Sequence, residues 1–161
     1  MKKLSLTFSV KDITDKAGDI SSVLGASRAS EEGVILFDAL SLTGDDYLMV
    51  NTAVGEAATE INNKCMGYVF DMFLLRRTDS ELIKRIDFEF ELPYDAECSI
   101  IYPLNESILS FFVYYLIGYW LGIKKPDEAE FYRTKASDYL SKVFSLLHRR
   151  KRGVKRKYHL Y

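Results

Sequence analysis

The chain has 161 residues, of which 48% are hydrophobic and 28% charged, a length and composition that suit one soluble globular domain and exclude a disordered chain. Its formal net charge of -1 hides an asymmetry, because seven of the 22 Lys and Arg residues lie within residues 149–157. The rest of the chain has 15 Lys and Arg and 23 Asp and Glu, so its net charge is about -8.

The first part of the chain predicts one strand followed by helices. Apolar residues alternate with Ser and Thr over residues 4–10, which predicts a strand with one buried face. A short helix or turn is expected over residues 12–24, where Gly18 weakens a helix. Residues 27–33 have the composition of a loop, and the apolar segment at residues 34–42 is expected to be helical.

A longer helix is expected over residues 45–68. Thr43 is a candidate N-cap, and Asp45 and Asp46 would complement the positive end of the helix dipole. The predicted apolar stripe of this helix contains Leu48, Val54, Ala58, Ile61 and Cys65.

The clearest strand covers residues 86–92, where apolar residues alternate with Asp87, Glu89 and Glu91. Its expected antiparallel partner is residues 70–76, with a turn at residues 78–80. The acidic side of this strand has two interpretations, a solvated surface or a surface complementary to a basic neighbour.

Two long helices are expected in the C-terminal half. The first covers residues 104–123, and the second begins at Pro126, since proline is favoured at the first helical position. Acidic residues crowd the start of the second helix and basic residues its end, the order that the helix dipole favours. Its apolar residues recur every three or four positions: Ala129, Tyr132, Ala136, Leu140, Val143 and Leu147. An antiparallel helical hairpin is therefore predicted.

Residues 108–123 contain no charged residue and are almost long enough to cross a bilayer. In membrane spans, Trp and Tyr are enriched at the two ends of the apolar run. Here three tyrosines lie inside the run instead. We therefore expect a buried core helix, with Trp120 in the core, and no membrane association.

Together these elements predict an α+β fold, mainly α: a helical bundle with a long C-terminal helical hairpin, a small antiparallel β-sheet and an extended basic C-terminal arm. Residues 1–148 are expected to form a single globular domain, and residues 149–161 the basic C-terminal arm. The first ten residues lack a long apolar region, so no secretion signal is expected.

Residues suited to catalysis or metal binding are scarce. Cys65 and Cys98 have no CxxC spacing, and both histidines, His148 and His159, lie near the C-terminus. No GxGxxG, phosphate-binding loop or HExxH sequence is present. We expect structural thiols in a reducing compartment, no enzymatic activity, no metal site and no cofactor.

The basic arm is the strongest functional signal. It could neutralise nucleic-acid phosphates without reading sequence, lie on an anionic membrane, enter a groove on another protein, or only add solubility. The residues predicted to bind a partner are Arg149, Arg150, Lys151, Arg152, Lys155, Arg156, Lys157, Tyr158, Leu160 and Tyr161. The predicted complementary acidic face consists of Asp87, Glu89 and Glu91.

Residues 86–157 resemble a known family. The strand IDFEFELP, the aromatic helix ILSFFVYYLIGYWLGI and the segment from KPDEAEFY to the basic run resemble neck proteins of tailed bacteriophages. The resemblance is to the head-to-tail connector (adaptor) or tail-completion type, as in phages of gut Bacteroidetes. In that family an aromatic-Trp-Leu sequence precedes a Glu-Ala-x-x-Tyr sequence. The counterparts here are Tyr119, Trp120 and Leu121, followed by Glu128, Ala129 and Tyr132.

The resemblance implies a non-enzymatic virion structural protein of the neck, assembled in the host cytoplasm. Such proteins form homo-oligomeric rings, often of twelve copies, that link the portal protein to other neck or tail proteins. They form part of the DNA channel, contact the passing genomic DNA and dock through C-terminal arms. The alternative function is a small non-specific nucleic-acid-binding or packaging-associated protein that acts through the basic tail. A membrane-associated protein held by the aromatic helix is a third, weaker possibility.

Overall fold

The computed structural model describes residues 1–26, 46–77, 82–94, 96 and 98–149. These ranges contain four helices and a three-stranded antiparallel sheet, which confirms the predicted mainly helical α+β fold. Several predicted features lie outside the described residues: the loop at 27–33, the helical segment at 34–42, Thr43, Asp45, the turn at 78–80 and the arm residues 150–161.

The sheet has the strand order β1-β3-β2, formed by β1 (Lys2–Ser9), β2 (Val69–Arg76) and β3 (Ile83–Leu92). The central strand β3 is antiparallel to both neighbours. Alternation along β3 buries Ile86, Phe88 and Phe90 completely on one face, as predicted. The strand expected at residues 4–10 is confirmed as β1, except that Val10 already begins a helix.

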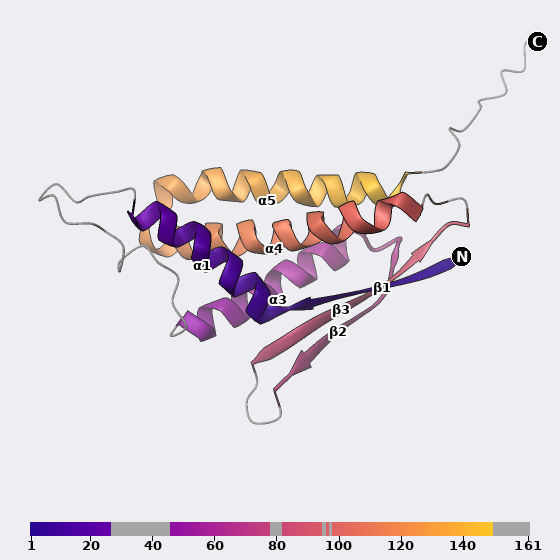
Figure 1. Ribbon diagram of the computed structural model, residues 1–161, viewed down its shortest axis with the longest axis horizontal. Coiled ribbons are helices and arrows are strands. Elements are labelled where there is room, and N and C mark those ends of the chain that lie inside the picture. The colour runs from indigo at the N-terminus through magenta and orange to yellow at the C-terminus, as the bar shows by residue number, and fades with distance from the viewer. Residues whose placement is uncertain (27–45, 78–81, 95, 97, 150–161) are drawn as a thin grey trace, which may run out of the picture.

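Helix α4 (Ile101–Lys124) is the central helix of the fold. Helix α5 (Pro126–Leu147) packs along its length, and α1 (Val10–Ala26) and α3 (Tyr47–Lys64) also contact it (Figure 1). The predicted hairpin is therefore confirmed, with all six periodic apolar residues of α5 buried. By length and composition α4 could cross a membrane, but 56% of its most apolar window is buried in the fold. Trp120 is among its buried residues, as expected.

An aromatic cluster joins the sheet to the hairpin. The ring centroid of Phe88 on β3 lies 6.2 Å from that of Phe8 on β1 and 6.4 Å from that of Phe112 on α4. The rings of Phe8 and Phe112 are 5.8 Å apart, so the three phenylalanines form a triangle. Such contacts add to the free energy gained by burying each ring.

The two shorter helices differ from expectation in detail. Helix α1 is not interrupted at Gly18 and has 17 residues, because burial of Ile13 and Ala17 packs one side of it against the core. Helix α3 begins at Tyr47, and Asp46 at its N-cap makes no side-chain cap hydrogen bond. Leu48, predicted in the apolar stripe of this helix, is 66% exposed. The buried residues of α3 are Val50, Ala53, Val54, Ala57, Ala58 and Ile61.

Candidate functional site

The predicted acidic residues of β3 lie together on the outer face of the sheet, opposite the buried phenylalanines. Asp87, Glu89 and Glu91 are all partly exposed there. Asp87 is paired within the sheet, since Nη2 of Arg85 lies 2.8 Å from its carboxylate and Oγ1 of Thr7 donates a hydrogen bond of 2.8 Å. In the described part of the chain, Glu89 and Glu91 make no ion pair.

Large apolar side chains of β2 lie beside these carboxylates. Phe70, Phe73 and Leu75 are 58%, 51% and 47% exposed. A bulge at Phe70 and Asp71 interrupts the pairing with β3, after which Phe73 lies opposite Asp87. Nζ of Lys3, from the far strand β1, lies 4.4 Å from the centroid of the Phe70 ring, a cation–π contact.

The register of the sheet also creates a like-charge pair. Asp71 of β2 lies directly opposite Glu89 of β3, an arrangement that destabilises a sheet. Oδ1 of Asp71 accepts a hydrogen bond of 2.8 Å from the backbone N–H of Met72, and neither carboxylate has an ion pair among the described residues. We call Phe70, Asp71, Phe73, Glu89 and Glu91 the acidic-aromatic strip. Its excess negative charge lies next to exposed rings, which suits a basic ligand.

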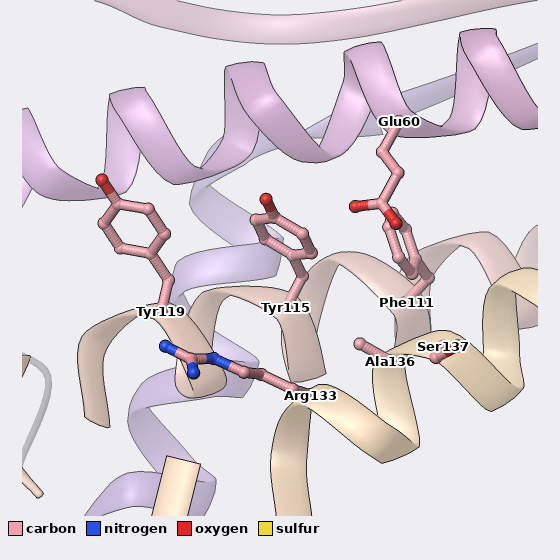
Figure 2. Close-up of a pocket in the computed structure, with 7 residues that line it drawn as sticks. All are labelled: Glu60, Phe111, Tyr115, Tyr119, Arg133, Ala136 and Ser137. Carbon is pink, nitrogen blue, oxygen red and sulfur yellow. The ribbon is translucent and has the colours of Figure 1, made fainter. Parts of the chain in front are cut away.

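A second surface feature is a groove between α3 and α5, with α4 as its floor (Figure 2). It encloses about 290 Å³. The floor consists of Phe111, Tyr115 and Tyr119, which recur every four residues along α4. Glu60 lines the groove from α3, and Arg133, Ala136 and Ser137 line it from α5.

The hydroxyl of Tyr115, on the floor of this groove, is hydrogen-bonded to α3. It donates a hydrogen bond of 3.3 Å to Oε2 of Glu56 on α3. Burial, and then the negative charges of Glu56 and Glu60, raise the pKa of Tyr115 to about 12. The phenol therefore stays protonated at neutral pH, where it can act as a hydrogen-bond donor but not as a base.

Two glycines of α4 let Arg133 of α5 lie close to the helix. A Cβ atom on Gly118 would stand 3.2 Å from both the backbone nitrogen and Cγ of Arg133. A Cβ atom on Gly122 would stand 2.5 Å from Nη2 of the same arginine. The glycines thus allow the close approach of the hairpin helices and leave the guanidinium beside Tyr119 (Figure 2).

Candidate metal ligands and nucleophiles do not converge in the described ranges. No group of three or more His, Cys, Asp or Glu residues there could hold a metal ion. Cys65 is buried and outside any disulfide, and burial raises the pKa of its thiol to about 11. Because the thiolate is the reactive form, this cysteine is expected to be a poor nucleophile at neutral pH.

Of the predicted arm residues, the structure describes only Arg149, which is exposed after the end of α5. The preceding ring of His148 packs edge-on against the ring of Tyr68, with centroids 4.9 Å apart. Tyr68 directly precedes β2, so the arm begins beside the sheet. The structure thus brings the start of the arm close to the end of β2 that carries Phe70 and Asp71.

Sequence reasoning identified the acidic residues of β3 but missed the apolar residues of β2 and the groove. The spacing of Phe111, Tyr115 and Tyr119, with Gly118 and Gly122 between the helices, is visible in the sequence. Which side of α4 stays partly uncovered depends on how α3 crosses it, and no local pattern contains that information.

Comparison of the chain with protein-family models, curated proteins and solved structures found no match. The resemblance to phage neck proteins therefore depends on the residues quoted for it. Four of them, Trp120, Leu121, Ala129 and Tyr132, are buried in the α4–α5 hairpin. Those residues stabilise the hairpin, so a function has to be argued from the exposed surfaces.

Proposed function

We propose that the protein is a virion structural subunit that assembles into a ring, the head-to-tail connector that links the portal to the tail. The supporting observation is that one chain carries the acidic-aromatic strip and, at residues 149–157 of its sequence, seven residues of the opposite charge. When one patch binds a different patch on the next copy, the contact is heterologous, and such contacts form a ring if the rotation from copy to copy closes and an open filament if it does not.

Charge and aromatic groups have separate roles in this proposal. Exposed ion pairs each contribute only about 0–1 kcal/mol, so the acidic and basic residues favour encounter and set the register. The affinity comes from aromatic anchors, which dominate many interfaces. Phe70 and Phe73 supply such anchors on the strip, and Tyr158 and Tyr161 on the arm.

The same arm would contact the portal protein and other neck or tail proteins, and genomic DNA would pass through the ring. A net charge of about -8 outside the arm would repel that DNA and let it slide. A ring whose channel is positively charged would contradict this part of the proposal.

The first test is the solution mass of three chains, each alone and with the cognate portal protein. These are the full chain, a version that ends at His148, and a version in which the seven Lys and Arg of residues 149–157 are Gln. We expect the full chain to form a ring-sized complex and both variants to lose it. A full chain that neither forms a ring nor binds the portal would contradict the proposal.

The alternative is a nucleic-acid-binding protein, and the seven basic residues within residues 149–157 favour it. Each phosphate that the arm neutralises would add about 0.9 to the slope of log affinity against log salt. Binding of a short duplex at two salt concentrations, by the same three chains, measures this slope. Steeply salt-dependent duplex binding without portal binding would favour the alternative.

A further inference from the structure

The basic arm begins at one edge of the sheet. Helix α5 ends at Leu147, and the next residue, His148, packs against Tyr68. The carbonyl oxygen of Tyr68 accepts a hydrogen bond of 2.7 Å from the backbone N–H of Glu91, at the adjacent end of β3. The end of α5 and the ends of β2 and β3 therefore meet at one edge of the molecule (Figure 1).

The outer face of the sheet has an acidic end and a basic end. Asp71, Glu89 and Glu91 lie toward the edge where α5 ends, whereas Arg76 and Arg85 lie toward the other end of β2 and β3. A basic segment would therefore be attracted to the near end and repelled from the far end.

The acidic end already attracts one cation. Nζ of Lys3 reaches across from β1 to the ring of Phe70, at 4.4 Å. Asp71 and Glu89 nevertheless remain opposite each other with no ion pair in the described ranges. Phe73 is half exposed beside them. The strip can therefore bind further cations through both carboxylates and through the face of this ring.

The distance along the sheet is short, and since α5 lies on the inner side of the sheet the arm must also pass around the edge strand β2 to reach the outer face. Asp71 lies three positions after Tyr68, which in a strand corresponds to about 10 Å. Arg150 and Lys151 follow His148 by two and three positions, and Arg152 by four. A tether this short gives the arm an effective concentration on the order of millimolar at the strip of its own subunit.

We propose that the basic segment of residues 150–157 docks on the acidic-aromatic strip of its own subunit before assembly. In the free subunit the segment neutralises the like-charge pair and covers the exposed rings of β2. Within the ring proposed above, the same segment would exchange to the strip of the next copy, as in domain swapping. Docking within one subunit does not itself depend on that ring.

Trypsin offers a direct test, because the segment supplies its cleavage sites and a docked segment is protected. The full chain would be digested at low salt, and the release of C-terminal peptides followed by mass spectrometry. We expect cleavage within residues 149–157 to be about tenfold faster in the double variant D71N/E89Q than in the unmodified chain. High salt should raise the rate of the unmodified chain toward that of the variant.

A matched control removes two exposed carboxylates of α5 instead, with Glu130→Gln and Asp138→Asn. This control should be cleaved at the rate of the unmodified chain. Equal rates in all three chains would overturn the proposal, while leaving the ring assay unaffected. Protection that grows with protein concentration would also overturn docking within one subunit, but would favour the exchange between copies on which the ring depends.

Discussion

The two faces of the one sheet are used in opposite ways. On the inner face, Phe88 and Phe90 have no exposed area and pack against the helices. On the outer face, Phe70 and Phe73 are more than half exposed, and Asp71 faces Glu89. A face that only had to be solvated would carry polar side chains on every strand. The difference indicates that the inner face specifies the fold, whereas the outer face is available for contact with another segment.

The largest expected effect comes from breaking the inner face. Phe88→Ala should lower the free energy of unfolding by about 3–5 kcal/mol, because it removes the ring that packs against both Phe8 and Phe112 and leaves a cavity. The matched substitution on the outer face, Phe73→Ala, should cost less than about 1 kcal/mol. Urea denaturation of both variants measures the difference. Similar losses would mean that the outer face is also packed in solution.

A second prediction concerns the two glycines of the hairpin. Gly118→Val should destabilise the protein by about 1–3 kcal/mol, because the new side chain meets the backbone of α5 at Arg133. Gly122→Ala should change stability by less than about 1 kcal/mol in either direction. Here only the mobile end of Arg133 must move, and alanine favours the helix. Thermal unfolding of both variants tests this. An equally large loss in Gly122→Ala would show that the guanidinium is held in place.

The elements predicted best are those whose periodicity is local. The alternation in β3 and the apolar spacing in α5 each specify a buried side without reference to the rest of the fold. Helix α3 was predicted less well, because its many small apolar residues offer more than one candidate stripe. Contact with α4 decides between them, burying Val50 and Ala53 and exposing Leu48. In α1, burial of Ile13 and Ala17 outweighs the cost of Gly18, about 1 kcal/mol.

In the candidate site, too, only the features that follow from a local pattern could be predicted from the sequence. Alternation alone places Asp87, Glu89 and Glu91 on one face, so these residues could be identified from sequence. The pairing of Asp71 with Glu89 depends on the register and on the bulge at Phe70, which become known only when the strands are paired. The meeting of His148 with Tyr68 is likewise a tertiary contact between distant parts of the chain.

A third prediction concerns alkaline pH. Burial raises the pKa of Cys65 from 9.0 to about 11, so between these values the folded state keeps a proton that the unfolded state releases. The resulting stability is complete below pH 9 and is lost as the pH rises toward 11. The urea midpoint should therefore fall over this range, and Cys65→Ala should make the fall shallower. An equally steep fall in the variant would assign the alkaline loss to other groups.

The smallest effect is expected from the ion pair on the outer face. Arg85 and Asp87 are 2.8 Å apart, but their side chains are 49% and 23% exposed, so water and salt screen the attraction. Arg85→Gln should change the free energy of unfolding by less than about 1 kcal/mol, and added salt should reduce the difference further. Parallel urea denaturation at low and high salt measures this small change. A larger loss that persists at high salt would mean that this end of the outer face contributes to the fold, and only the acidic-aromatic strip would then remain as a surface free for docking.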